Sequence, residues 1–301
     1  MTPVERPWTT LVDAATLVEV LDAAQLRLVD ARATSSLRVV DARFALNDSR
    51  AGRALFLSGH LPGAVYADLN DDLSDLERTG HGRHPVPDSA AFAETLGRLG
   101  IGPRTQVVVY DEGDGSMAAA RLWWLLRLMG HTEVAVLDGG VAAWQEAGLP
   151  LTGDITDVDP LPSYPGALDA RQIVGVEEVA ARLKHAPGWL LDARAPERFR
   201  GEIEPLDPVA GHVPGAVNRP FALNVAEGRL RPAGELHTEL QAAIGATAPD
   251  RVVLMCGSGV TACHLLLAME HAGLHGARVY ADSWSGWISD PSRPVATSTA
   301  A

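Results

Sequence analysis

Residues 59–65 read Gly-His-Leu-Pro-Gly-Ala-Val, and residues 211–217 read Gly-His-Val-Pro-Gly-Ala-Val. A segment of this length that recurs with one change indicates an internal duplication. Two copies in a chain of 301 residues are too few and too long for a solenoid. The repeat therefore predicts two similar domains, which agrees with the usual size of a single hydrophobic core.

The same landmarks flank both copies in the same order. An apolar strand ending in Asp-Ala-Arg precedes each copy, at residues 39–43 and 190–194, and a second apolar strand follows, at residues 107–111 and 252–256. Short apolar strands that alternate with helical stretches predict a parallel sheet covered by helices on both faces. We therefore expect an α/β fold made of two tandem domains, each with such a sheet.

The helical periodicity is clearest over residues 118–129 and 262–271, where apolar residues recur at helical spacing. Between the two copies, the segment up to residue 168 is rich in proline and acidic residues without an amphipathic period, which is typical of a linker. We expect a first domain over residues 1–155, a linker over 156–168 and a second domain over 169–301.

The composition narrows the function. The chain has 38 acidic and 25 basic residues, and a net charge of −13 disfavours binding to nucleic acids and to acidic membranes. We expect no signal peptide and no membrane span, and the use of only two cysteines fits a reducing cytoplasm. Cys256 and Cys263 are the two cysteines, which excludes a disulfide framework and leaves no zinc-binding spacing. We expect neither a metal nor a cofactor.

One stretch of the second repeat has the residues needed for nucleophilic chemistry. Cys256 ends an apolar strand, and residues 257–262 read Gly-Ser-Gly-Val-Thr-Ala before a predicted helix. Glycines let the backbone turn its N–H groups inward, and the start of the helix adds a positive partial charge. Such a loop stabilises an anion and favours the thiolate, the nucleophilic form of cysteine. We predict that Cys256 is catalytic and that Cys263, on the apolar face of the helix, is a core residue. The loop residues expected to hold the transferred group are Gly257, Gly259, Val260 and Thr261.

The loop at residues 256–262, together with the duplicated Gly-His-x-Pro-Gly-Ala segment, resembles the two-domain rhodanese superfamily over essentially the whole chain. Within it, the loop is similar to the 3-mercaptopyruvate sulfurtransferase branch, whereas the thiosulfate branch usually carries two basic residues where Gly257 and Ser258 stand. The resemblance implies two rhodanese-like domains, of which one is catalytic. Asp111 stands in the first repeat where Cys256 stands in the second, and an aspartate cannot carry a persulfide. We therefore expect the first domain to be a structural partner.

The resemblance also implies residues that bind an anionic sulfur donor. Arg198 matches the arginine that binds substrate in this family, and a forked guanidinium suits a carboxylate or thiosulfate. The mercaptopyruvate branch has a second arginine nine positions later, where this chain has Asp207, a residue often found in the thiosulfate branch. The two markers disagree, so the donor stays open between mercaptopyruvate and thiosulfate. Trp284 has no counterpart in the first repeat and is expected to line the donor site.

A relay of a serine, a histidine and an aspartate has been proposed for the mercaptopyruvate branch. The resemblance carries these roles to Ser258, His84 and Asp68, with His81 as the alternative histidine. Such a relay would handle the proton of the donor thiol.

Residues that recur in both copies need a role common to both. Because the first copy lacks the cysteine, that role must be structural. We expect His60 and His212 to be hydrogen-bonded turn residues, and the repeated Asp-Ala-Arg segments to brace the ends of their strands.

Two other functions compete with this interpretation. A cysteine phosphatase requires Cys-x5-Arg, but the sixth residue after Cys256 is Ala262. A protein persulfide carrier without turnover of small donors would have the same sequence. We predict a sulfurtransferase that moves sulfur from 3-mercaptopyruvate through a Cys256 persulfide to cyanide or to a thiol such as thioredoxin or a low-molecular-weight thiol. A thiosulfate sulfurtransferase is the alternative.

Overall fold

The computed structural model describes residues 7–27, 37–113 and 115–298, without the side chains of residues 22–27. Most of the N-terminal stretch behind the expectation of no signal peptide, residues 1–6, lies outside this description. Among the described residues, every helix is too short or too polar to span a bilayer.

The chain divides into two compact units. The first comprises Met1–Leu73 and Pro87–Leu168, and the second comprises Ser74–Val86 and Asp169–Ala301. The segment 74–86 thus belongs to the second unit although it lies within the first repeat. The predicted linker contains no helix or strand over residues 156–168.

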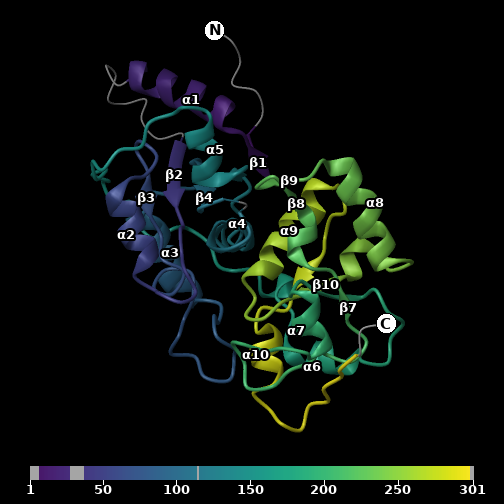
Figure 1. Ribbon diagram of the computed structural model, residues 1–301. Helices are drawn as coiled ribbons and strands as arrows, with labels where there is room; N and C mark the ends of the chain where they lie inside the picture. The colour runs from purple at the N-terminus through teal and green to yellow at the C-terminus, as the bar shows by residue number, and fades with distance from the viewer. Residues whose placement is uncertain (1–6, 28–36, 114, 299–301) are drawn as a thin grey trace. The chain divides into compact units, whose positions relative to one another are not determined.

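The described part of the first unit contains a five-stranded sheet in the order β1-β5-β4-β2-β3, in which all neighbours are parallel (Figure 1). The strands are β1 (Leu11–Val12), β2 (Leu37–Asp41), β3 (Val65–Tyr66), β4 (Gln106–Tyr110) and β5 (Val134–Leu137). The helices are α1 (Ala14–Arg27), α2 (Ala51–Ser58), α3 (Ser89–Arg98), α4 (Ala118–Leu128) and α5 (Gly140–Glu146).

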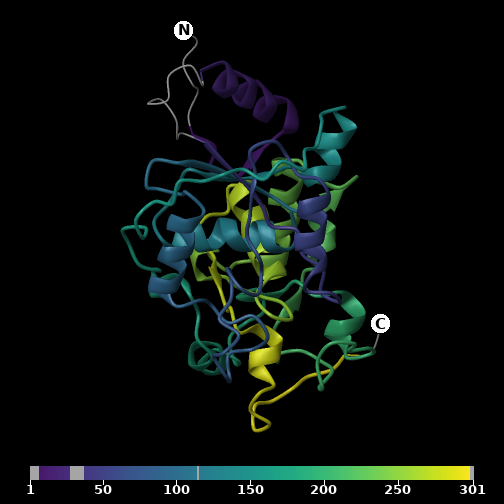
Figure 2. The same ribbon diagram turned by 90° about the vertical axis from the view of Figure 1, so that its left-hand side faces the viewer.

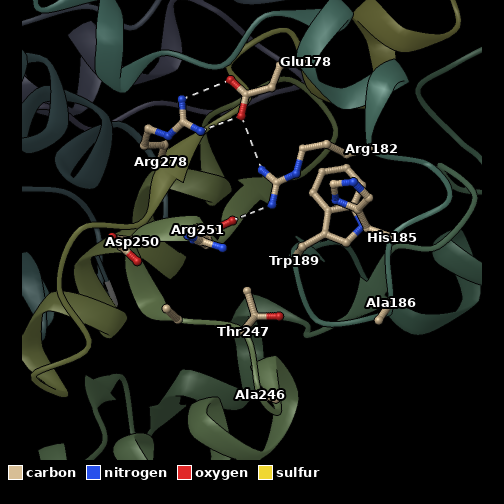
Figure 3. Close-up of a pocket in the computed structure, with 11 residues that line it drawn as sticks. Glu178, Arg182, His185, Ala186, Trp189, Ala246, Thr247, Asp250, Arg251 and Arg278 are labelled. Atoms are coloured by element: carbon tan, nitrogen blue, oxygen red, sulfur yellow. Dashed lines mark hydrogen bonds and ion pairs between the residues drawn. The ribbon is translucent and has the colours of Figure 1, made fainter.

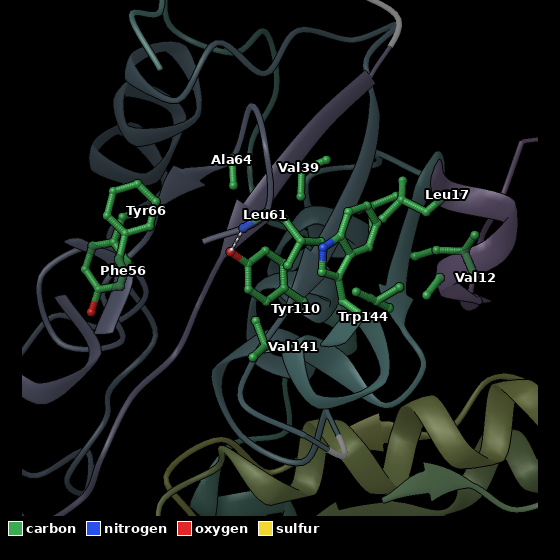
Figure 4. Packing of buried hydrophobic residues seen from close by; sticks show 14 residues of the cluster. Val12, Leu17, Val39, Phe56, Leu61, Ala64, Tyr66, Tyr110, Val141 and Trp144 are labelled. Carbon is green, nitrogen blue, oxygen red and sulfur yellow. Dashed lines mark hydrogen bonds between the residues drawn. The ribbon is translucent and has the colours of Figure 1, made fainter. Parts of the chain in front are cut away.

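Helices cover both faces of this sheet. On one face, Leu17 of α1, Phe56 of α2 and Trp144 of α5 join a buried cluster with strand residues such as Val39 and Tyr110 (Figure 4). Helix α4 packs against β4 and β5 but supplies no residue to this cluster. Because successive strand residues point to opposite faces, α4 covers the other face.

The second unit repeats the same plan with a four-stranded parallel sheet in the order β11-β10-β6-β7. The strands are β6 (Leu190–Asp192), β7 (Val217–Asn218), β10 (Val253–Met255) and β11 (Arg278–Val279), with a separate antiparallel pair, β8 (Val225–Ala226) and β9 (Arg229–Leu230). The helices are α6 (Val176–Ala181), α7 (Pro196–Arg200), α8 (Ala233–Ile244), α9 (Thr261–His271) and α10 (Ser283–Trp287), with short 3-10 turns at Ala170–Gln172, Phe221–Asn224 and Pro249–Arg251.

The strand orders β5-β4-β2-β3 and β11-β10-β6-β7 correspond one to one. Helices α6 and α10 contribute to a buried cluster on one face of the second sheet. Helix α9 packs against β10 and β11, supplies no residue to that cluster and so covers the other face; its carboxyl-terminal half is drawn in yellow in Figure 2. The predicted α/β fold with two tandem parallel sheets is confirmed.

The duplicated segments make the same contacts in each unit. His60 Nδ1 lies 2.7 Å from the Phe56 carbonyl oxygen, and His212 Nδ1 lies 2.7 Å from that of Phe199. Each imidazole also stacks on the ring of the same phenylalanine, with centroids 4.0 Å and 3.8 Å apart. The prediction that both histidines are hydrogen-bonded turn residues is confirmed.

The Asp-Ala-Arg segments brace their strand ends in the same way. Arg43 pairs with Asp41 and donates to the Gly59 carbonyl oxygen over 2.6 Å. Arg194 pairs with Asp192 and donates to the Gly211 carbonyl oxygen over 2.7 Å. Each buried arginine therefore ties the end of a strand to the start of the repeated Gly-His-x-Pro-Gly turn of its unit.

Candidate active site in the second unit

Cys256 follows directly after β10 and is 1% exposed. The loop that begins with it ends at α9, so the thiol lies between the carboxyl end of a parallel strand and the amino end of an 11-residue helix. In parallel α/β sheets, this edge is where ligands bind.

The loop surrounds the sulfur with polar groups. The backbone N–H of Gly259 donates to Cys256 Sγ over 3.1 Å. Ser283 Oγ lies 4.0 Å from the same sulfur, and it also accepts a 3.0 Å hydrogen bond from the backbone N–H of Cys256. The Ser283 hydroxyl donates to the Tyr280 carbonyl oxygen over 2.9 Å, so the Gly259 N–H and the positive end of the α9 dipole are the groups that favour a negative charge on Sγ. The loop can therefore hold a thiolate or the terminal sulfur of a persulfide.

Ser283 is a site residue that the sequence did not single out. It has φ +53, in the left-handed region that β-carbon-bearing residues avoid. Its equivalent in the first repeat is Gly140, with φ +54, as counting back from Trp144 and Trp287 shows. An alignment of the two repeats could have found Ser283, because it places a serine in the repeat that has the cysteine where the other repeat has a glycine.

Asp111 occupies the corresponding place in the first unit, after β4. Its carboxylate accepts hydrogen bonds from the backbone N–H groups of Gly115, over 2.9 Å, and of Gly113 and Met117, each over 3.3 Å. The loop of the first unit therefore binds a carboxylate of its own chain. This arrangement supports the expectation that the first unit carries no sulfur.

Two residues of the predicted relay lie together. His84 Nδ1 is 2.8 Å from Ser258 Oγ, and both side chains are buried. His84 belongs to the segment 74–86 that groups with the second unit. Asp68 belongs to the first unit, where its carboxylate accepts hydrogen bonds from the Tyr66 hydroxyl and the backbone N–H of Asn70.

Arg198 is held by carboxylates on one side. Its Nε and Nη2 donate to Glu204, with a shortest distance of 2.6 Å, and Nη2 also lies 3.3 Å from Asp207 Oδ2. The other oxygen of Asp207 forms an ion pair with Arg83 Nη1. Both carboxylates are 3% exposed in their side chains, so these ion pairs are largely shielded from solvent screening.

The two guanidinium groups converge on the catalytic loop. A Cβ atom placed on Gly257 would lie 3.0 Å from Arg83 Nη2, 3.5 Å from Arg198 Nη2 and 3.6 Å from Arg198 Nη1. Glycine at this position lets both cations approach the loop backbone next to Cys256. Arg83 is thus a second cation at the site, and its position in sequence, far from the loop, carried no signal of this.

Trp284 contacts the loop through its backbone N–H, which donates to the Cys256 carbonyl oxygen over 3.0 Å. Its ring is fully buried, and its Nε1 donates to the Val209 carbonyl oxygen over 2.9 Å. The guanidinium carbon of Arg194 is 4.6 Å from the centre of the ring. Trp284 therefore supports the loop and Arg194 and presents no surface to a donor, in contrast to the substrate-lining role expected from the sequence.

Arg194 adds positive charge near the sulfur. Burial lowers the pKa of Arg194, but Asp192, Glu204 and, more weakly, Cys256 raise it, and the net shift is upward. Arg194 therefore stays protonated beside the catalytic loop.

The other predicted residues of this segment lie at the start of α9 or within it. Val260 is buried and precedes the first residue of α9, which is the half-buried Thr261. Cys263 is fully buried, and its thiol donates to the Gly259 carbonyl oxygen over 3.1 Å. The prediction that Cys263 is a core residue is confirmed.

A separate pocket of about 690 Å³ opens at the opposite edge of the second sheet. Arg182 and Arg278 line it but both pair with Glu178, and Arg182 also lies 4.4 Å from the ring of Trp189 (Figure 3). None of the predicted site residues lines this pocket. In the described residues, no group of three or more His, Cys, Asp or Glu could hold a metal ion.

The chain is similar to known proteins over most of its length. A family model described as a rhodanese-like domain matches residues 13–147 and 175–290. A Pseudomonas aeruginosa protein, named provisionally as a 3-mercaptopyruvate sulfurtransferase, is 47% identical over 264 residues, which cover 87% of this chain and 92% of that protein. A Mycobacterium tuberculosis protein, named provisionally as a thiosulfate sulfurtransferase, is 41% identical over 282 residues, covering 89% of this chain and 94% of that protein.

The solved structure of 3-mercaptopyruvate sulfurtransferase from Leishmania major is similar with a TM-score of 0.80 at 28% identity. The match covers 95% of this chain and 77% of that chain. The family model matches twice, once in each half of the chain, and the two sheets have the same strand order. The chain therefore belongs to the rhodanese family, as a sulfurtransferase with two rhodanese-like domains.

Proposed function

We propose that the chain transfers sulfur from 3-mercaptopyruvate to a thiol or cyanide acceptor through a persulfide on Cys256. The observation that carries this proposal is the Gly259 N–H on Cys256 Sγ, inside a loop that also meets two guanidinium groups. The Gly259 N–H stabilises the sulfur anion, and the guanidinium groups bind the carboxylate of the donor.

The mechanism is a double displacement. The Cys256 thiolate attacks the donor sulfur, an S–S bond forms, and the C–S bond breaks to leave the enolate of pyruvate. The proton of the donor thiol is transferred to that carbon, which Ser258 and His84 are placed to assist. An acceptor thiolate then attacks the outer sulfur, takes it as a persulfide and regenerates the Cys256 thiolate.

Thiosulfate is the second candidate donor. The observation that favours it is Asp207 at the place of the second arginine, together with the similarity to the Mycobacterium tuberculosis protein. The neutral Gly257 and Ser258 of the loop support mercaptopyruvate instead. We propose a cytoplasmic location, because both cysteines are free thiols. Thioredoxin or a low-molecular-weight thiol is the proposed acceptor.

The test is to measure pyruvate release from mercaptopyruvate with a thiol acceptor, beside sulfite release from thiosulfate. Intact-mass measurement after donor treatment should show one added sulfur on the wild type and on Cys263→Ser, and none on Cys256→Ser. Turnover of neither donor, or equal sulfur uptake by Cys256→Ser, would contradict the proposal.

A further inference from the structure

We propose that Arg83 is the second donor-binding arginine of this enzyme and that Asp207 positions it. The proposal rests on the proposed function, in which a carboxylate-bearing donor binds beside Cys256. It assigns to a residue of the segment 74–86 the role that the mercaptopyruvate branch gives to an arginine at the position of Asp207.

The backbone at Arg83 is fixed against the catalytic side of the second unit. Its N–H donates to Ser285 Oγ over 3.1 Å. The preceding Gly82 has φ +81, and a Cβ there would lie 2.5 Å from the Asp282 carbonyl oxygen. The segment therefore packs directly on the start of α10, and a position this close requires glycine. These contacts fix the position of the Arg83 backbone, from which its side chain extends.

Asp207 determines where the side chain of Arg83 goes. One carboxylate oxygen pairs with Arg83 Nη1 and the other with Arg198 Nη2. Glu204 accepts from Nε and Nη2 of Arg198, so that both carboxylates lie on the same side of this guanidinium group. In the part of the chain that the structure describes, Arg83 Nη2 and Arg198 Nη1 have no protein acceptor. These are atoms that face Gly257.

This arrangement leaves two donor edges, from two arginines, directed at one point beside the nucleophile. A carboxylate at that point can accept from both, as a bidentate clamp built from separate side chains. Its location next to Gly257 places the rest of a small donor near Cys256 Sγ.

The charge balance selects among donors. Arg83 and Arg198 are matched by Glu204 and Asp207, so the four groups together are neutral. A monocarboxylate needs directed hydrogen-bond donors but little excess positive charge. A dianion such as thiosulfate gains more from a net positive cluster, such as two basic residues in the loop. The Asp207–Arg83 pair therefore favours mercaptopyruvate, and Asp207 here is a partner of an arginine rather than a marker of a thiosulfate enzyme.

The test is steady-state kinetics of Arg83→Gln with mercaptopyruvate. Arg83 is partly exposed, so the variant should fold, and circular dichroism checks this. We expect KM to rise by about tenfold to a hundredfold with kcat within about threefold of wild type, because a carboxylate contact made equally in the ground and transition states is lost. Arg200→Gln is the matched control: Arg200 lies on the same helix as Arg198 but pairs with Glu202, so the KM of this variant should not change.

The charge-reversed double variant Arg83→Asp with Asp207→Arg returns the arginine to the other position of the pair. It should recover much of the KM that Arg83→Asp alone loses. Asp207→Asn should raise the efficiency with thiosulfate relative to mercaptopyruvate by about fivefold or more, because it leaves one positive charge unbalanced.

Calorimetric binding of pyruvate to a Cys256→Ser background separates this inference from the proposed function. Weaker binding upon Arg83→Gln, but not upon Arg200→Gln, supports the inference even if wild type fails to turn over mercaptopyruvate. Equal pyruvate affinity and equal KM in wild type and Arg83→Gln would overturn it while leaving the sulfur transfer itself intact.

Discussion

His84 Nδ1 lies 2.8 Å from Ser258 Oγ, although the two residues are 174 positions apart in the chain. Both side chains are at most 7% exposed. A hydrogen bond in such a setting is strengthened by the low local dielectric, and a neutral histidine can accept the hydroxyl proton. The pair has the geometry of a base and a hydroxyl that move a proton together.

We predict that Ser258→Ala and His84→Gln each lower kcat with mercaptopyruvate by about a hundredfold or more. The double variant should lose little beyond the worse single variant, because the two residues act as a unit. Turnover of thiosulfate, which brings no thiol proton, should fall much less. His81→Gln is the control, since His81 pairs with Asp282 and not with Ser258. If His81→Gln lowered kcat as much as His84→Gln, the assignment of the relay histidine to His84 would be wrong.

Ser283 separates activity from backbone strain. Ser283→Ala removes the hydroxyl that receives the Cys256 N–H and keeps a left-handed residue with a β-carbon. Ser283→Gly removes the same hydroxyl and relieves the strain. Both variants should lose sulfur transfer, and the glycine variant should be more stable than the alanine variant by about 1 kcal/mol. Thermal unfolding with parallel kinetics measures both effects. An alanine variant as stable as the glycine variant contradicts the assignment of strain.

Gly259 and Gly273 form a matched pair. Both have left-handed φ, +78 and +76, but a Cβ on Gly259 would overlap the Ala281 carbonyl oxygen, whereas a Cβ on Gly273 would meet no atom of the described residues within 4 Å. Alanine at either position costs about 1 kcal/mol of backbone strain. Gly259→Ala should in addition displace the loop and abolish persulfide formation, while Gly273→Ala should keep it. Intact-mass analysis after donor treatment distinguishes them. Full sulfur loading of Gly259→Ala would contradict the role of the loop geometry.

The lowered pKa of His212 predicts that the protein is less stable in acid. Burial lowers the pKa of His212 below its usual 6.5, despite the hydrogen bond to the Phe199 carbonyl. The unfolded chain therefore takes up the proton first as the pH falls below about 6.5, and the free energy of unfolding decreases there, by at most about 1.4 kcal/mol per pH unit for this proton. We expect His212→Asn to be less stable at pH 7.5 but to show a smaller fall by pH 5.5. Urea unfolding at both pH values measures the difference, and an unchanged fall would remove His212 as its source.

Much of the fold was predictable because its determinants are local. The strand ending at Asp192 and the one preceding Cys256 are short apolar runs, and their alternation with helices implies the parallel sheet. The position of Cys256 followed from the strand, the glycines and the helix around it. The duplication also allowed the two copies to be compared, and the presence of His60 and His212 in both copies correctly indicated structural roles for them.

The residues that escaped prediction share a physical reason. Arg83 and Ser283 act through tertiary contacts with the loop, and neither lies near Cys256 in sequence. Arg83 could be found only once the chain path of residues 74–86 was known. Trp284 was expected to contact the donor because it is an aromatic residue unique to the second repeat, but aromatic size equally favours the core, where it lies.

The grouping of Ser74–Val86 with the second unit bears on how such a chain evolves. A gene split at the border near residue 168 would separate His84 and Arg83 from Cys256. After duplication the first copy could lose its cysteine, yet selection acting on the surviving site would still preserve a stretch of that copy. Both repeats therefore have to stay in one chain for the second unit to keep Arg83 and His84.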